Sequence, residues 1–191
     1  MGLKRLNVIA AVANNGGIGK ENKLPWKIRE DMTFFSRITS TAQEGKKNAV
    51  ILGRRTWLSF PPKFRPLPSR INVVVSTQLE SVPEGTHLVK SFEDSLHLLE
   101  SLIDSGQVDE VFIIGGHGLY KEALEQEVYP VRLYYTHIMK DFDCDTFFPS
   151  VDWERFKPIQ LDTVDSDLRH SGDIEFRFAV YEKQPHPLND H

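Results

Sequence analysis

VFIIGGHG, residues 111–118, has the composition of a buried β-strand that stops at a glycine turn. The apolar spacing over Leu119 to Gln126 then predicts a helix. Three other apolar runs of strand length occur earlier, at Leu6 to Val12 (LNVIAAV), Asn48 to Leu52 (NAVIL) and Ile71 to Val75 (INVVV). Strands that are apolar throughout and alternate with helices predict an α/β sheet covered on both faces.

The rest of the chain adds a helix and two longer strands. Ser91-Phe92-Glu93-Asp94 resembles a capping box and predicts a helix that runs to about Ile103. Val131 to Met139 and Ile174 to Glu182 are predicted strands, and the second alternates apolar and polar residues as an antiparallel edge strand does. The Pro-rich piece from Pro61 to Pro68 is predicted to be a connecting loop.

The composition is typical of a soluble globular protein. Its 191 residues are 40% hydrophobic and 26% charged, and the net charge of −4 argues against a nucleic-acid partner. The single Cys144 suits a reducing compartment, and no stretch approaches membrane-spanning length, so we expect a cytoplasmic location. Apart from His186 and His191 near the end of the chain, the seven His residues lack metal-ligand spacing, so no metal is expected. We predict a monomer with one domain over residues 1–191, a core at about 6–182 and a flexible tail at 184–191.

Asp31 lies where an amphipathic helix should present only apolar side chains. Between Trp26 and Ile38, apolar residues recur at positions 28, 32, 35 and 38, along one stripe of a predicted helix. Asp31 projects from the same stripe, and an ionised carboxylate among apolar groups is costly unless something binds it. Either a ligand supplies that partner, or backbone N–H groups of the first helical turn do.

Several predicted strands end in residues that suit phosphate binding. In an α/β sheet, ligands bind beyond the carboxyl ends of the strands, where helix N-termini offer free N–H groups. One strand ends at Gly53. The next three residues in the sequence, Arg54-Arg55-Thr56, can bind several phosphate oxygens. The other candidates are Gly16-Gly17-Ile18-Gly19, Gly115-Gly116-His117-Gly118, Ser76-Thr77 and Lys90. Neither glycine cluster completes G-x-G-x-x-G, and each feature alone fits a turn or a solvated surface; together they predict a nucleotide with an extra phosphate.

These motifs together resemble the dihydrofolate reductase family over about residues 6 to 182. They are Gly19 with Leu24-Pro25-Trp26, Asp31 with Phe35, Gly53-Arg54-Arg55-Thr56-Trp57, Ser59 with Pro61, Leu67 with Arg70, Ile113-Ile114-Gly115-Gly116 with Tyr120, and Thr136 with Asp145-Thr146-Phe147-Phe148-Pro149. The resemblance implies a single α/β domain with a mostly parallel eight-stranded sheet, an antiparallel C-terminal strand and flanking helices. It also implies reduction of 7,8-dihydrofolate by NADPH, with hydride transfer to C6 and protonation at N5, and binding of antifolate inhibitors.

The resemblance implies a catalytic role for four residues. Asp31 would bind the ring nitrogen and 2-amino group of the pteridine, and Thr136 would support that contact. Trp26 would bind an ordered water, and Leu24 would lie on a mobile loop that closes over the nicotinamide. Because Asp31 would contact the far side of the ring from N5, we expect the N5 proton to arrive through water. Burial should raise the pKa of Asp31.

The same resemblance implies the remaining binding residues. Arg70 would pair with the glutamate α-carboxylate of the substrate, and Gly115-Gly116 would lie where the two pockets meet. The other substrate-binding residues would be Ile9, Ala11, Met32, Phe35, Phe60, Phe64, Leu67, Ile114 and Tyr120. The cofactor-binding residues would be Ala11, Ile18, Gly19, Gly53, Arg54, Arg55, Thr56, Ser76, Thr77, Lys90, Ile114, Gly115, Gly116, His117, Gly118, Leu119 and Tyr120.

The chain also departs from the family pattern. The short spacing between Trp26 and Asp31 resembles bacterial members, whereas much of the rest resembles eukaryotic ones. Thr77 stands where animal members often have Arg, so the 2′-phosphate would depend more on Arg54 and Lys90. Two alternatives stay open: a reductase of the same fold for another pterin or a pyrimidine, and a catalytically silent folate-binding protein.

Overall fold

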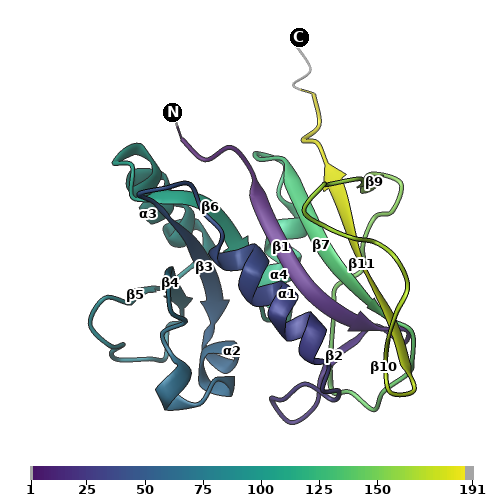
Figure 1. The fold of residues 1–191 in the computed structure, drawn as a ribbon. Helices are drawn as coiled ribbons and strands as arrows, with labels where there is room; N and C mark the ends of the chain where they lie inside the picture. Colours follow the sequence, from purple (N-terminus) through teal and green to yellow (C-terminus); the bar gives the residue numbers. More distant parts are fainter. Residues whose placement is uncertain (1, 188–191) are drawn as a thin grey trace.

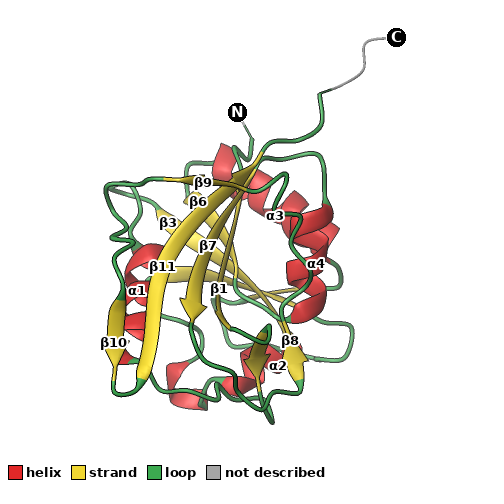
Figure 2. Ribbon diagram, turned by 90° about the vertical axis from the view of Figure 1, so that its right-hand side faces the viewer, coloured by secondary structure: helices red, strands yellow, loops and turns green. Residues whose placement is uncertain are grey.

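The computed structural model describes residues 2–187, which form one main sheet between two layers of helices (Figures 1 and 2). Eight of its strands follow each other in the order β10-β11-β7-β1-β6-β3-β4-β5. Their bounds are β1 (Leu6–Ala13), β3 (Lys47–Gly53), β4 (Arg70–Val75), β5 (His87–Val89), β6 (Val108–Ile113), β7 (Val131–Ile138), β10 (Arg169–Ser171) and β11 (Ile174–Lys183). Strands β7, β1, β6, β3, β4 and β5 are parallel, and β11 runs antiparallel to β7. The expected mostly parallel sheet with an antiparallel C-terminal strand is therefore confirmed, but the sheet has nine strands rather than the eight expected, because β9 also pairs with β11.

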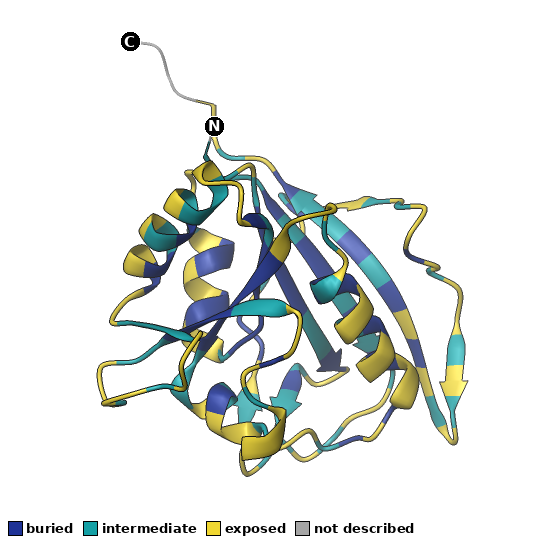
Figure 3. Ribbon diagram, turned by 60° about the vertical axis from the view of Figure 1, so that its left-hand side comes forward, coloured by how far each residue is buried: buried dark blue, intermediate teal, exposed yellow. Residues whose placement is uncertain are grey.

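The helices divide between the two faces of the sheet. Helix α1 (Arg29–Ser40) packs on one face together with Trp57 of the short helix α2 (Arg54–Ser59). Helices α3 (Phe92–Asp104) and α4 (His117–Glu125) cover the other face. Figure 3 shows the central strands buried and the helices exposed along their outer sides. This two-sided cover explains the apolar runs within β1, β3, β4 and β6.

Several short elements were not predicted. They are β2 (Gly17–Gly19), the 3-10 helix η1 (Pro62–Phe64), β8 (Thr146–Phe147), β9 (Lys157–Ile159), and the strands β5 and β10 and helix α2 given above. Strands β2 and β8 pair into a separate two-stranded sheet, and β9 pairs with β11. The prediction that β11 lies at an edge was wrong, because β9 and β10 pair with its outer side. The predicted loop at 61–68 contains η1.

Helix α1 differs from its prediction in start and in orientation. It begins at Arg29 rather than at Trp26, and its buried residues are Asp31, Phe34, Ile38 and Thr39. Met32, predicted on the buried stripe, is 57% exposed. Phe34 and Phe35 are adjacent apolar residues, so periodicity alone could not decide which one faces the sheet. Phe34 does so, because its ring stacks on Phe178 of β11 at 4.0 Å between centroids.

Two further predictions concern the capped helix α3 and a flexible C-terminal tail. Ser91 caps α3, since its Oγ accepts a hydrogen bond from the Asp94 N–H at 3.0 Å. The predicted flexibility of residues 184–191 stays a prediction, and 188–191 lie outside the described residues. In the described part of that tail, Arg155 donates a hydrogen bond to the Gln184 carbonyl, and Glu127 accepts one from the His186 N–H at 3.2 Å.

Candidate functional site

A buried carboxylate joins α1 to the middle of the sheet. Asp31 is 9% exposed, and its Oδ1 accepts a hydrogen bond from the Thr136 hydroxyl of β7 at 2.8 Å. Thr136 pairs with Ala11 of β1 on one side and with Phe178 of β11 on the other. The structure therefore favours an inward-facing Asp31 over the alternative in which backbone N–H groups of the first turn satisfy it.

The electrostatics of this carboxylate depend on burial. Burial raises the pKa of Asp31, as expected, and the hydrogen bond from Thr136 opposes the rise. Tyr120 of α4 shares the site: its hydroxyl donates to the Ile9 carbonyl at 2.8 Å, and burial and the charge of Asp31 both raise the pKa of Tyr120. Among the described residues, no Lys, Arg or His forms an ion pair with Asp31. A positively charged or N–H-rich ligand would supply what the carboxylate lacks.

Trp26 contributes a buried polar group that has no hydrogen-bond partner among the described residues. The side chain is 6% exposed, and its ring lies 5.2 Å from that of Phe142. Its Nε1–H is buried and donates to no acceptor in the part of the chain that the structure describes. An unsatisfied buried N–H is uncommon and indicates a site for a water or a ligand atom.

The loop before β4 holds Arg70 firmly. Its Nε donates to the Pro68 carbonyl and its Nη1 to the Thr39 hydroxyl of α1, both at 2.9 Å. The buried Asn72 accepts from the Leu67 N–H at 2.9 Å and donates to the Leu67 and Arg70 carbonyls at 3.0 Å. Partial burial lowers the pKa of Arg70, which still carries its charge at neutral pH. Sequence analysis missed Thr39 and Asn72, although Asn72 is a single polar residue within the apolar run of β4.

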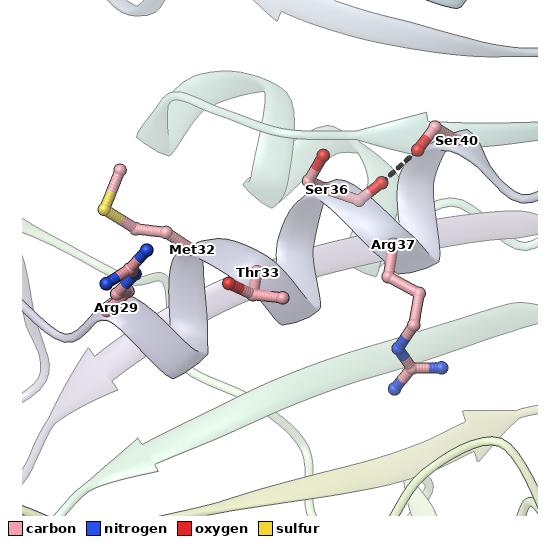
Figure 4. A pocket seen from close by; sticks show the side chains of 6 residues that line it. All are labelled: Arg29, Met32, Thr33, Ser36, Arg37 and Ser40. Carbon is pink, nitrogen blue, oxygen red and sulfur yellow. Dashed lines mark hydrogen bonds between the residues drawn. The ribbon is translucent and has the colours of Figure 1, made fainter.

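The apolar side chains predicted for the substrate site, the nicotinamide side and the mobile loop lie at three depths. Ile9, Leu67 and Ile114 are buried, whereas Ala11, Ile18, Phe35 and Phe60 are half-buried. Leu24, Met32 and Phe64 are more than half exposed. Figure 4 shows Met32 on the outer stripe of α1, where an open cavity of about 480 Å³ is lined by Arg29, Met32, Thr33, Ser36, Arg37 and Ser40. In Figure 4, Arg37 and Ser36 project from opposite sides of the helix. The positively charged side chains of this cavity, Arg29 and Arg37, therefore do not converge on one ligand position.

Two glycine turns meet at the carboxyl edge of the sheet. The Gly53 N–H donates to the Gly115 carbonyl at 2.8 Å, since β3 and β6 are neighbouring parallel strands. Gly115 has a φ of +127°, which favours glycine, and a Cβ there would lie 3.1 Å from the Thr56 hydroxyl. Gly53 and Gly116 are the N-caps of α2 and α4, and neither helix has a side-chain cap, whereas α3 does. Two helix N-termini therefore present backbone N–H groups side by side.

Arg54 and Arg55 lie beside these N-termini. An open cavity of about 530 Å³ is lined by Glu21, Asn22, Arg54, Arg55, Leu58, Asp145 and Thr146. The loop across it is fixed by Asp145, which accepts from the Glu21 N–H at 2.9 Å through Oδ2 and donates its own N–H to the Gly19 carbonyl at 3.0 Å. Asp145 belongs to one of the family motifs, but this role in fixing the loop was not predicted from the sequence.

The remaining predicted cofactor residues lie close to this edge, and the Ser76 hydroxyl is already used within its own turn. The Ser76 N–H donates to the Val89 carbonyl at 2.9 Å, which brings the end of β4 beside Lys90. The Ser76 hydroxyl already accepts from the Gln78 and Leu79 N–H groups at 3.0 and 3.1 Å, so it is partly used within its own turn. Thr77 and Lys90 are exposed, as are His117 and Gly118. His117 Nδ1 lies 2.8 Å from the Phe147 carbonyl, and Leu119 is buried against Gly53.

No group of three or more His, Cys, Asp or Glu side chains within residues 2–187 could hold a metal ion. No described helix combines the length and hydropathy required to cross a membrane.

Comparisons with known proteins place the chain. A family model described as dihydrofolate reductase matches residues 5–183. The dihydrofolate reductase of Schistosoma mansoni is 50% identical over 178 residues, or 93% of this chain and 96% of that protein. That of Sus scrofa is 45% identical over 185 residues, or 95% of this chain and 99% of that protein. The solved structure of the Schistosoma mansoni dihydrofolate reductase has a TM-score of 0.86 at 49% identity, covering 95% of this chain and 99% of that chain. The chain therefore belongs to the dihydrofolate reductase family.

Proposed function

We propose that this chain catalyses the NADPH-dependent reduction of 7,8-dihydrofolate to 5,6,7,8-tetrahydrofolate, the carrier used in one-carbon, thymidylate and purine metabolism. The observation that carries the proposal is the buried Asp31 carboxylate, whose described side-chain partner is the Thr136 hydroxyl. A carboxylate with free lone pairs in an apolar site can accept two parallel N–H groups from a heterocycle. The ring nitrogen and 2-amino group of a pteridine present that pair of donors.

Residues around Asp31 would complete the substrate site. Thr136 fixes one carboxylate oxygen and so sets the orientation of the pteridine. The buried Ile9 and Ile114, with Ala11 and the exposed Met32, would form its apolar walls, and Tyr120 would close the far end. Phe35, Phe60, Phe64 and Leu67 would enclose the aminobenzoyl ring, and Arg70 would bind the glutamate α-carboxylate. Because Thr39 and Asn72 hold Arg70 and its loop in place, little ordering is needed when the substrate binds.

The carboxyl edge of the sheet fits NADPH. The paired N-termini of α2 and α4 suit a pyrophosphate, and the glycine contact at Gly53 and Gly115 lets a ligand approach the backbone closely. Arg54, Arg55 and Thr56 would add charge-assisted bonds to the phosphates, and Ser76, Thr77 and Lys90 would extend them to the 2′-phosphate. The nicotinamide side would be lined by Ala11, Ile18, Gly19, Ile114, Gly115, Gly116, His117, Gly118, Leu119 and Tyr120. When bound, NADPH supplies the hydride.

The protein would orient the reactants and supply the proton path. Apolar walls exclude water from the reacting face and hold the two rings together, which is the proximity contribution to catalysis. Burial keeps the pKa of Asp31 high, so the carboxyl can carry a proton in the free enzyme closer to neutral pH than an exposed Asp can. Trp26 Nε1, buried and available, would hold a water near the pteridine, and the N5 proton would pass through water. Leu24, 53% exposed, would cover the site from the loop.

We also propose that the protein acts as a cytoplasmic monomer and binds antifolates at the pteridine site. The single Cys144 suits a reducing compartment. Two of the exposed large apolar residues, Met32 and Phe64, are accounted for by the proposed substrate site, and Leu24 by the loop that would cover the nicotinamide. Light scattering of the purified protein tests the oligomeric state.

One assay tests the activity and separates it from the two alternatives. Loss of NADPH absorbance is measured with dihydrofolate and in a control without it. A rate that needs dihydrofolate supports the proposal. Binding of dihydrofolate without turnover would favour a silent folate-binding protein. Turnover of another pterin or a pyrimidine, but not of dihydrofolate, would favour a different reductase of the same fold.

A further inference from the structure

Arg169 of β10 contacts helix α1, the loop before β10 and strand β11, and α1 is distant from it in the sequence. Its Nη1 donates to Glu30 Oε2 of α1 at 2.8 Å, and its Nη2 donates to Asp165 Oδ2 at 3.2 Å. Its guanidinium carbon lies over the Phe178 ring of β11, 5.4 Å from the centroid. The side chain is 32% exposed, so two carboxylates and an aromatic face hold it at the surface.

The aromatic contact continues beneath α1. Phe178 stacks on Phe34 with 13° between the ring planes, and Phe34 is a buried residue of α1. Phe178 is also the cross-strand partner of Thr136, whose hydroxyl binds Asp31. Arg169, Phe178 and Phe34 therefore form a stack. Phe178, in the middle of this stack, lies beside Thr136, the residue that binds Asp31.

The first turn of α1 is held from two sides. Its N-cap residue, Ile28, makes no side-chain cap hydrogen bond. Adjacent residues of a helix project about 100° apart, so Glu30 and Asp31 point to different sides of the turn. Asp31 binds Thr136 in the sheet, and Glu30 binds Arg169 on β10. A rotation or slide of this turn would lengthen both contacts.

We propose that Arg169 is a positioning residue for Asp31: through Glu30 and the Phe178–Phe34 stack, it fixes the rotation of the first turn of α1 relative to β7. The inference rests on the proposed function, because Asp31 is the group that it positions. Partly exposed ion pairs contribute little to stability. A small misplacement of a reacting or orienting group, in contrast, lowers the rate markedly. The effect of Arg169 should therefore be seen in catalysis more than in folding.

The test is a double-mutant cycle with Arg169→Gln, Glu30→Gln and the two combined, measured with dihydrofolate and NADPH. Each single variant should lower kcat/KM for dihydrofolate by about 5- to 10-fold, and the double variant should be no worse than Arg169→Gln alone, which already removes the Glu30 contact. The KM for NADPH should not change. The matched control is Arg132→Gln, which removes the Arg132–Glu182 ion pair of 2.8 Å between β7 and β11 and should leave kcat/KM unchanged.

Three results would overturn the inference: wild-type kcat/KM in folded Arg169→Gln, losses that multiply in the double variant, or an equal loss in Arg132→Gln. If Arg169→Gln does not fold, Glu30→Gln alone decides, because it breaks the same contact from an exposed position on α1. An inactive wild type would contradict the proposed function itself. An active wild type with an unaffected Arg169→Gln contradicts only the role of Arg169.

Discussion

The two ends of the proposed site are built in opposite ways. At the α1–β7 end, Asp31, Thr136 and Tyr120 are buried, and each makes a hydrogen bond to another part of the protein. At the edge formed by the ends of β3, β4 and β5, Arg55, Thr77 and Lys90 are exposed. The buried end is set before a ligand arrives, whereas the exposed end offers charge that a ligand must organise.

This difference implies different energetics at the two ends. A buried carboxylate is costly in the free protein, so a ligand that satisfies it gains both a strong hydrogen bond and relief of that cost. Exposed arginines and lysines are solvated, so each phosphate contact contributes less and depends on salt. Substitutions at the buried end should therefore affect turnover more than substitutions at the exposed end, where the phosphates would bind.

The largest effect is expected for Asp31→Asn. The amide keeps the shape and the hydrogen bond from Thr136 but cannot carry the negative charge or the proton. We expect kcat at neutral pH to fall by about 100-fold or more, with NADPH affinity unchanged. Steady-state rates and NADPH titration measure the two quantities. Near-normal turnover at neutral pH would remove Asp31 from the mechanism.

The next largest effect is expected for Arg70→Ala. Loss of a charged partner held by Thr39 and Pro68 should raise the KM for dihydrofolate by about 10- to 100-fold. A dihydropteridine that lacks the aminobenzoylglutamate should bind the variant and the wild type equally. Equal losses for both substrates would instead make Arg70 a structural residue.

A smaller effect is expected at the phosphate end. Arg54→Ala should raise the KM for NADPH by about 10-fold while the KM for dihydrofolate stays the same, because one charge-assisted contact is lost. The wild-type KM for NADPH should also rise with ionic strength, and less steeply in the variant. Lys121→Ala, which removes an exposed cation paired with Glu125 on α4, is the control and should change neither. A change in both KM values for Arg54→Ala would contradict a phosphate contact.

Local patterns predicted the parts of the fold that local forces determine. The apolar runs of β1, β3, β4 and β6 and the cap of α3 were evident because burial and capping leave their signals in consecutive residues. Asp31 was evident for the same reason, as a polar residue among apolar ones. Asn72 gives an equal signal within INVVV, and the same reasoning could have found it.

Contacts between distant segments left no such signal. Strands β2 and β8 pair Gly17 with Phe147, and each has two or three residues, too few for a period to appear. Arg169 reaches Glu30 across 139 positions, so nothing near either residue indicates the pair. The orientation of α1 was missed because Phe34 and Phe35 are equivalent in the sequence and only the ring of Phe178 distinguishes them.

The smallest expected effect concerns stability, and it has the opposite sign to the effect on turnover. Burial raises the pKa of Asp31 above its ordinary value of 3.8, so the folded state binds a proton that the unfolded state releases as the pH rises through 3.8. Stability contributed by this group therefore falls between pH 3.8 and the higher folded-state pKa, and the loss persists at neutral pH. Asp31→Asn removes this loss of stability, because the amide does not ionise. The Tm of the variant at pH 7 should therefore exceed that of the wild type, and the difference in Tm should narrow towards pH 4. A lower Tm for the variant at pH 7, measured calorimetrically without ligands, would show that the carboxylate is stabilised in the free protein and that the two ends of the site are more alike than their burial indicates.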